Sequence, residues 1–310
     1  MKESSSEKLK QEIVRYKKEQ NAVILAHYYV DGEVQETADY VGDSYYLSKL
    51  AVELEEQNII FCGVSFMGES AKILNPEKRV VMADEYADCP MAHMVSIARI
   101  QQVRQEYPGV AVVCYVNSTA EIKAYSDVCV TSSNAVRVVK NLAQKKIFFI
   151  PDNNLGRYVA KQVPQKEFIF HDGFCHVHKS IQKEELLAAK KTHPQAEVLT
   201  HPECTQDVLE ESDFIGSTSE IINYATESLG KEFIICTEMG IFYELGQKNP
   251  EKKFYSVGHR QFCPNMKKIS LEKVRDALVK MEPEVQVPQE IAERAKKPLE
   301  RMLELAQQEG

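Results

Sequence analysis

The sequence predicts an α/β fold of three similar three-layer units, each a parallel sheet covered by helices, arranged around a pseudo-threefold axis. Two observations carry this prediction. Short apolar runs typical of buried strands alternate with helical patterns along the chain, and the same order of runs occurs three times. Strands that alternate with helices form parallel sheets with helices on their faces, so each copy predicts one unit.

Each copy opens with an apolar run that ends in polar residues, as a buried strand does. The opening strands are AVILAHYY (22–29), VAVVCYVN (110–117) and EVLTHPEC (197–204). A short apolar pair, small hydroxyl residues and a helical pattern follow in ADYVGDSYYL (38–47), SDVCVTSSNAV (126–136) and SDFIGSTSEII (212–222). Two further strands separated by a helix complete each copy, beginning at IIFCGV (59–64), IFFIPD (147–152) and FIICTE (233–238).

The three copies keep a constant register. Equivalent residues recur at steps of 88 and then 86 residues, as in His27, Tyr115 and His201 and in Asp39, Asp127 and Asp213. We expect a first unit with an N-terminal helix at 1–108, a second at 109–193 and a third with C-terminal helices at 194–310. The amphipathic segments after residue 270 should pack on the third unit, and an amphipathic helix at 6–19 should cover the first.

Composition restricts the class of partner. The formal net charge is −8, so the chain lacks the general basic surface that binds nucleic acid or an anionic membrane. Its first residues lack the apolar core of a signal peptide, and no apolar run approaches the roughly 20 residues of a membrane span. We therefore expect a cytoplasmic protein with small-molecule ligands. Walker, Rossmann and nucleophile-elbow motifs are absent from the sequence.

Three of the eight cysteines stand at equivalent positions. Cys89, Cys175 and Cys263 each follow the last strand of a copy, so three equivalent units would bring their thiols together. Cys62, Cys129 and Cys236 lie inside apolar runs and are expected to be buried hydrophobic residues, whereas the roles of Cys114 and Cys204 stay open. The sequence contains no CxxC pair, which argues against a zinc ribbon or a local ferredoxin motif.

Three converging thiolates suit two kinds of metal centre. One is a zinc ion completed by a fourth ligand, and the other is a cubane iron–sulfur cluster with one open iron that acts as a Lewis acid. A zinc-dependent lyase or hydrolase, a cluster-dependent synthase and a cluster-based sensor without turnover are all compatible with this pattern.

Polar residues follow the opening strands, where ligands bind in parallel sheets. Residues two apart on an extended segment point the same way, so three pairs are expected to present two groups each. The pairs are His27 and Tyr29, Tyr115 and Asn117, and His201 and Glu203. Hydroxyl residues stand at three predicted helix starts, where they can cap backbone N–H groups and where the helix dipole favours anions. They are Ser44, Ser132 and Thr218. His178, three residues after Cys175, is a further candidate.

These segments resemble a known family. LAHYY, ADYVGDS, FCGVSFMGESAKILNP, CPMAHM, PDNNLG, GFCHVH, HPEC, GSTSEI and FCPNMK together resemble the quinolinate synthases over about residues 21–268. The resemblance implies three α/β units around a pseudo-threefold axis and a [4Fe-4S] cluster. It also implies condensation of iminoaspartate (iminosuccinate) with dihydroxyacetone phosphate to quinolinate, with loss of phosphate and two waters, in de novo NAD biosynthesis. An aspartate oxidase or dehydrogenase would supply the imine.

The resemblance also implies residue roles. Cys89, Cys175 and Cys263 would hold the cluster, and Glu203 would abstract a proton, with Tyr29 as a closing acid–base residue. Catalytic roles extend to His201 and Tyr115. Substrate-binding positions are matched by His27, Ser44, Tyr115, Asn117, Ser132, His178, His201, Glu203 and Thr218. Some family members carry a CxxCxxC run ending at the third ligand; this chain has Val257 and Arg260 there, so redox control by that route is not expected.

Overall fold

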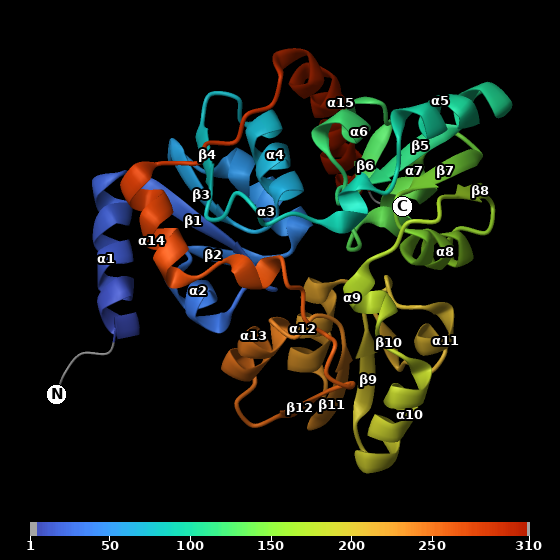
Figure 1. The fold of residues 1–310 in the computed structure, drawn as a ribbon. Coiled ribbons are helices and arrows are strands. Elements are labelled where there is room, and N and C mark those ends of the chain that lie inside the picture. Colours follow the sequence, from blue (N-terminus) through green and yellow to red (C-terminus); the bar gives the residue numbers. More distant parts are fainter. Residues whose placement is uncertain (1–4, 309–310) are drawn as a thin grey trace.

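The computed structural model describes residues 5–308. It contains three parallel sheets, one for each copy of the repeat (Figure 1). Each sheet has four strands, and in each the second strand of the copy lies beside the first, followed by the third and the fourth. The orders are β2-β1-β3-β4, β6-β5-β7-β8 and β10-β9-β11-β12. The predicted α/β class and the threefold repeat are therefore confirmed.

The strands lie where the apolar runs predict them. The first sheet contains β1 (Ala22–His27), β2 (Tyr40–Gly42), β3 (Asn58–Cys62) and β4 (Arg79–Met82). The second contains β5 (Ala111–Tyr115), β6 (Val128–Val130), β7 (Lys146–Ile150) and β8 (Glu167–Phe170). The third contains β9 (Glu197–Thr200), β10 (Phe214–Ile215), β11 (Glu232–Cys236) and β12 (Lys253–Ser256). Every residue of β1 and β5 is buried, as expected for central strands covered on both faces.

Helices connect the strands within each unit. The first unit has α2 (Gly32–Thr37), α3 (Ser44–Glu53) and α4 (Ser65–Leu74), and the second has α6 (Ala120–Ala124), α7 (Ala135–Asn141) and α8 (Asn153–Gln162). The third has α11 (Gln206–Leu209), α12 (Thr218–Glu227) and α13 (Ile241–Lys248). After the fourth strands come η1 (Pro90–His93) and α5 (Ile97–Glu106), α9 (His176–Lys179) and α10 (Lys183–Thr192), and η2 (Met266–Lys268).

The repeated aspartate fastens the start of the second strand to the first. The backbone N–H of Asp39 donates to the carbonyl of Ile24, and its carboxylate accepts the N–H of the same residue at 2.8 Å. Asp127 makes the same two bonds to Val112, and Asp213 makes them to Val198. The aspartate thus satisfies backbone groups at a strand edge, which explains its place in all three copies.

A repeated lysine closes one helix in each unit. The ammonium of Lys78 donates to carbonyls of Ala51 and Leu54 at the end of α3. Lys166 does the same for α7, and Lys252 does it for α12. The last carbonyls of a helix have no partner within the helix, so a lysine supplies the missing donors.

The C-terminal helices pack on the first two units. Helix α14 (Leu271–Lys280) contacts α2, β3 and the N-terminal helix α1 (Ser5–Glu19), while α15 (Gln289–Gln307) contacts α4, α6, α7 and β6 (Figure 1). The expectation that they pack on the third unit is wrong. An amphipathic pattern specifies that one face is buried but not which neighbour buries it. The boundaries of the three units stay predictions.

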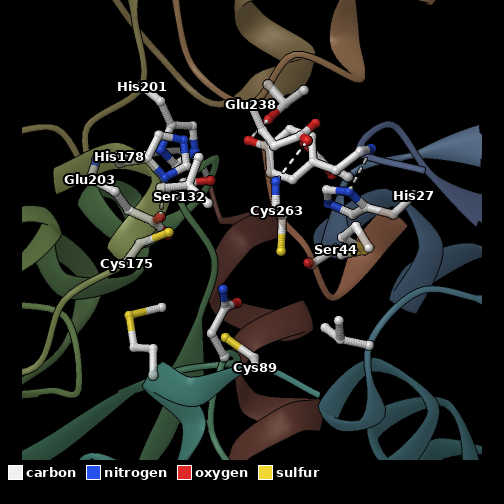
Figure 2. A pocket seen from close by; sticks show the side chains of 18 of the residues that line it. His27, Ser44, Cys89, Ser132, Cys175, His178, His201, Glu203, Glu238 and Cys263 are labelled. Carbon is white, nitrogen blue, oxygen red and sulfur yellow. Dashed lines mark hydrogen bonds and ion pairs between the residues drawn. The ribbon is translucent and has the colours of Figure 1, made fainter. Parts of the chain in front are cut away.

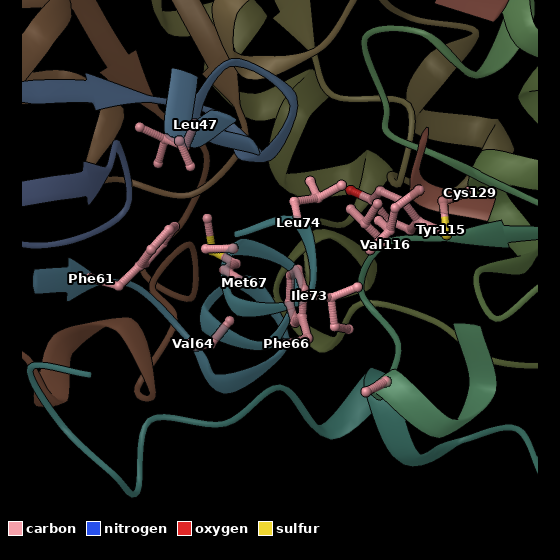
Figure 3. Packing of buried hydrophobic residues seen from close by; sticks show 14 of the residues in the cluster. Leu47, Phe61, Val64, Phe66, Met67, Ile73, Leu74, Tyr115, Val116 and Cys129 are labelled. Atoms are coloured by element: carbon pink, nitrogen blue, oxygen red, sulfur yellow. The ribbon is translucent and has the colours of Figure 1, made fainter. Parts of the chain in front are cut away.

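The apolar core is divided unequally. One continuous cluster runs through the first unit, the second unit and the C-terminal helices, and Figure 3 shows part of it from Leu47 and Phe61 to Val116 and Cys129. Two smaller clusters lie on the third sheet, one containing Phe233 together with Tyr28 of the first unit, and the other containing Ile234 together with Ile181 and Leu186. Successive strand residues point to opposite faces, so these clusters lie on the two faces of the third sheet.

Among residues 5–308, every helix is too short or too polar to traverse a lipid bilayer.

Candidate active site

One cavity is lined by residues from all three units (Figure 2). It lies beyond the carboxyl ends of the strands, where parallel sheets place their ligands. All thirteen site residues expected from the sequence line it: His27, Tyr29, Ser44, Cys89, Tyr115, Asn117, Ser132, Cys175, His178, His201, Glu203, Thr218 and Cys263. We call it the central cavity. The structure brings these residues together, and the roles assigned to them stay predictions.

Three cysteines enter the central cavity from equivalent loops. Cys89 directly precedes η1, Cys175 directly precedes α9, and Cys263 comes three residues before η2. Figure 2 shows their sulfur atoms directed into the same space, and each side chain is only partly buried. The other five cysteines are fully buried, as expected for Cys62, Cys129 and Cys236.

Backbone N–H groups are directed at each of these three thiols. Cys89 accepts from Met91 and Ala92, Cys175 from His178, and Cys263 from Asn265 and Met266. Hydrogen bonds to sulfur and short helices that begin beside it stabilise thiolates and tune iron–sulfur clusters. The three thiols therefore fit the corners of a cluster with three protein ligands.

Burial raises the pKa of these thiols, that of Cys89 to about 12. A thiol with such a pKa becomes a thiolate only where positive charge compensates for the lost hydration. A bound metal centre supplies that charge, which agrees with three cysteines facing one space.

Buried carboxylates hold the loops of two of the cysteines. One oxygen of Asp152 accepts the backbone N–H of Cys175 at 3.0 Å, and one oxygen of Glu238 accepts that of Cys263 at 3.0 Å. Both acids are fully buried, and they stand at equivalent positions of the repeat. The first unit has Val64 at that position, and there Asp88 accepts the N–H of Cys89 at 2.8 Å.

Glu203 of the third unit contacts polar groups of the second. Its carboxylate oxygen is 2.6 Å from Nδ1 of His178, and Tyr115 donates a hydrogen bond to it. Burial favours a high pKa for Glu203, but the charge of His178, its contact and the hydrogen bond from Tyr115 outweigh burial and lower the pKa. Glu203 is therefore ionised in this buried place, and its oxygens can accept a proton.

Two histidines at equivalent positions are held neutral. Nδ1 of His27 accepts the backbone N–H of Tyr29 at 3.1 Å, and Nδ1 of His201 accepts that of Glu203 at 3.3 Å. Burial lowers the pKa of each imidazole to about 3. Because Nδ1 is an acceptor, the proton of each ring is on Nε2.

Tyr29 reaches across from the first unit to the third. Its hydroxyl is 2.8 Å from Oγ1 of Thr218 and 2.9 Å from Oγ1 of Thr237. Burial raises the pKa of Tyr29 well above its ordinary value, so the phenol keeps its proton. A neutral phenol in a desolvated site can donate a proton to a group that becomes negative during a reaction.

The hydroxyl residues at the helix starts differ in detail from the expectation that they cap the helices. Asp43 and Ser217 cap α3 and α12, and Ser44 and Thr218 occupy the first helical positions. Ser132 lies in the turn before α7. In α3 and α12 the acceptor of a first N–H group therefore comes one residue earlier, and all three predicted hydroxyls line the cavity.

Sequence reasoning missed Thr237, Glu238 and Asp152. Thr237 directly follows β11, and Glu238 and Asp152 are each the second residue after the third strand of a copy, where an apolar run ends. Aligning the three copies gives the one available signal, because the position of Thr237 is Gly63 in the first copy and Pro151 in the second. Only the third copy has a hydroxyl there.

Comparison with known proteins gives a consistent result. Residues 11–304 match the protein family described as Quinolinate synthetase A protein. A quinolinate synthase of Caldicellulosiruptor saccharolyticus is 51% identical over 300 residues, covering 97% of this chain and 99% of that protein. The quinolinate synthase of Fusobacterium nucleatum is 53% identical over 298 residues, covering 96% of this chain and 99% of the relative. That of Clostridioides difficile is 51% identical over 296 residues, covering 96% and 97%.

Proposed function

The chain belongs to the quinolinate synthase family of biosynthetic enzymes, and from this we propose that it condenses iminoaspartate (iminosuccinate) with dihydroxyacetone phosphate. The product is quinolinate, formed with loss of phosphate and two waters, in de novo NAD biosynthesis. The observation that carries the proposal is the meeting of one cysteine from each unit with several acid–base groups in the central cavity.

Cys89, Cys175 and Cys263 would hold a [4Fe-4S] cluster, since each is partly exposed to the cavity and accepts backbone N–H groups. When bound, such a cluster supplies one iron with an open coordination position, which is a Lewis acid for substrate oxygen or nitrogen.

The chain's own side chains would move the protons. Glu203 is ionised and desolvated, so it would accept the proton removed from the substrate, and Tyr115 would orient it by its hydrogen bond. Tyr29 keeps its proton and would donate it where a hydroxyl group leaves. His178 and His201 stack with ring centroids 4.4 Å apart, and both would contact the same side of the substrate.

The anionic ends of the substrates would be bound by neutral donors. Nε2–H of His27, Nε2–H of His201 and the side chain of Asn117 line the cavity together with the hydroxyls of Ser44 and Ser132. The helix that begins at Ser44 directs the positive end of its dipole at the same space. A cavity with these donors favours substrates that carry carboxylate and phosphate groups.

Anaerobic purification followed by iron, sulfide and quinolinate measurement tests the proposal. The wild-type chain should contain about four irons per chain, as a cubane does, and should form quinolinate from the two substrates. Cys89→Ala, Cys175→Ala and Cys263→Ala should each lose the cluster, whereas the matched control Cys236→Ala should keep it. A full cluster in any of the three variants would overturn the ligand assignment.

Glu203→Gln separates proton transfer from cluster binding. The amide has nearly the shape of the carboxylate but does not accept the substrate proton. We expect an unchanged iron and sulfide content with turnover lowered on the order of 100-fold to 10,000-fold. Turnover at the wild-type rate would remove Glu203 from the proposed role.

A mononuclear zinc centre is the second candidate, because Cys175, His178 and Glu203 each offer a ligand atom within 4.8 Å of the others. Sulfur, imidazole nitrogen and carboxylate oxygen are all common zinc ligands. This centre does not use Cys89, so the Cys89→Ala variant distinguishes the candidates. Stoichiometric zinc retained in that variant, together with a colourless wild-type protein, would favour the zinc enzyme.

A further inference from the structure

We propose that Thr237 is a positioning residue that connects the proposed acid Tyr29 to the proposed base Glu203 through the ring of His178. The proposal rests on the proposed function and adds a residue to it. Thr237 directly follows β11, has no solvent exposure and lies just behind the side chains that line the central cavity.

The hydroxyl of Thr237 joins the third unit to the other two. Its Oγ1 is 2.9 Å from the hydroxyl of Tyr29, which follows the first strand of the first unit, and 2.9 Å from Nε2 of His178. On the other side of the imidazole, Nδ1 lies 2.6 Å from Oε2 of Glu203. A continuous series of polar atoms thus leads from the phenol to the carboxylate.

A hydroxyl is the group that this position requires. A threonine hydroxyl donates one hydrogen bond and accepts others, so it can serve Tyr29 and His178 at the same time. Nδ1 of His178 lies 2.6 Å from the ionised Glu203, so it presents a proton rather than a lone pair to the carboxylate. The hydroxyl of Thr237 contacts both Nε2 of His178 and the hydroxyl of Tyr29, and it thereby fixes the ring that faces Glu203.

The backbone holds Thr237 firmly in this place. The side-chain amide of Gln261, itself buried, donates to the carbonyl of Thr237 at 2.7 Å and to that of Ile235 at 2.7 Å. The next residue, Glu238, accepts the N–H groups of Gly240 and Cys263. The strand end is therefore fixed on both sides, and the position of Oγ1 follows from the fold.

The connection holds the proposed acid and the proposed base in fixed positions. Thr237 holds the hydroxyl of Tyr29 at 2.9 Å and Nε2 of His178 at 2.9 Å, and the same ring places Nδ1 at 2.6 Å from Glu203. Loss of the Thr237 hydroxyl would therefore release the orientation of both groups without removing a contact to the substrate.

The three-copy comparison points to the same residue. The equivalent positions are Gly63 and Pro151, which have no side-chain donor or acceptor. The third copy is also the one that carries Glu203, at the position of Tyr29 in the first copy and Asn117 in the second. The hydroxyl of Thr237 therefore occurs in the unit that contains the proposed base.

Replacement of Thr237 by valine or serine tests the proposal. Valine has the shape of threonine without the hydroxyl, and serine keeps the hydroxyl. In the cluster-loaded enzyme we expect Thr237→Val to lower kcat on the order of 100-fold, within the usual contribution of acid–base groups. KM should stay within about twofold, since no substrate contact is removed. Thr237→Ser should recover most of the wild-type kcat.

A matched control uses a second buried threonine of the same unit. Thr200 is also fully buried, and its hydroxyl contacts that of Ser212 at 2.6 Å, outside the path from Tyr29 to Glu203. Thr200→Val should leave kcat near the wild-type value. Iron and sulfide content should be equal in all four proteins, which shows that the cluster is not what changed.

The possible results separate the inference from the proposed function. If the wild type forms quinolinate and Thr237→Val is equally fast, the connection is wrong while the function stands. If Thr237→Ser is as slow as Thr237→Val, the position depends on shape rather than on the hydroxyl, and the proposal fails. If the wild type with a full cluster forms no quinolinate, the proposed function itself fails.

Discussion

The first two units and the third differ in how they are packed in the protein. The first two share a single apolar core, and α14 and α15 pack on them. The third sheet has two separate apolar clusters, one of which includes Tyr28 of the first unit, and polar contacts around the central cavity also join the third unit to the first. Among these contacts are Tyr29 with Thr218 and Thr237, and Ser219 with Asp43.

The shared core of the first two units is apolar, whereas the boundary of the third unit includes residues of the proposed active site. A shared core couples the first two units, because removing one would expose the apolar surface of the other. The polar contacts of the third unit join groups that also line the site, such as Tyr29 and Thr218. The boundary between the third unit and the rest is therefore the place where the structure and the proposed proton transfers depend on the same hydrogen bonds.

The largest effect is expected in the shared core. Leu299 of α15 has no solvent exposure, so Leu299→Ala leaves a cavity between the first two units. We expect the free energy of unfolding to fall by about 2–5 kcal/mol. Leu229→Ala makes the same change in the third unit at a residue that is 94% exposed, and it should change stability by less than about 0.5 kcal/mol. Urea unfolding measures both, and equal effects would contradict the assignment of α15 to the shared core.

A smaller effect is expected at the polar boundary. Ser219 of α12 donates to the carboxylate of Asp43 at 2.6 Å, which joins the third unit to the first. Ser219→Ala should lower the free energy of unfolding by about 1.5–3 kcal/mol, the usual contribution of a hydrogen bond to a charged group. Amide hydrogen exchange should become faster around α12 and the loop before α3 while the shared core keeps its protection.

The control for Ser219 is another serine of the same unit. Ser228 donates to Glu197 at 3.1 Å, and both residues belong to the third unit. Ser228→Ala should therefore leave exchange in the loop before α3 unchanged. Faster exchange there in both variants would mean that the boundary has no special dependence on Ser219.

The smallest effect, taken per pH unit, should come from the two neutral histidines. His27 belongs to the first unit and His201 to the third, and burial lowers the pKa of each to about 3. The unfolded chain binds protons at these residues below about pH 6.5, whereas the folded chain does not. The contribution of these histidines to the free energy of unfolding is therefore fully present above pH 6.5. On acidification toward pH 3 it should fall by about 1.4 kcal/mol per pH unit for each histidine.

Replacement of each histidine by glutamine measures how much of the acid sensitivity comes from each unit. His27→Gln and His201→Gln should each reduce the slope of stability against pH between pH 6 and 4 by about the share of one histidine, about 1.4 kcal/mol per pH unit. Urea unfolding at several pH values gives the slopes. An unchanged slope in both variants would show that other groups cause the acid sensitivity.

Much of the fold could be predicted from the sequence because the same strand and turn signals occur in all three copies. Each opening strand is a continuous apolar run, and Asp39, Asp127 and Asp213 recur at a constant distance from it. The partners of α14 and α15 could not be predicted, since Val274 and Leu299 indicate burial without naming a neighbour.

The residues of the site could be predicted where they end a strand or follow a repeat position, as Cys263 and Glu203 do. Thr237 and Asp152 could not, because they act from behind the cavity wall or through backbone N–H groups. Their contacts depend on atoms brought together by tertiary structure, and a side chain at the end of an apolar run has the same local sequence whether or not such a partner exists.

The repeated aspartates and lysines have a consequence for how such a protein can change. Asp39, Asp127 and Asp213 fasten the strands of their units, and Lys78, Lys166 and Lys252 close the helices, with the same chemistry in every copy. The residues that face the cavity differ from copy to copy, as Tyr29, Asn117 and Glu203 do. A duplicated chain built in this way can acquire new functional groups in one copy while the other two remain as they were, so three equal scaffolds can surround an asymmetric substrate.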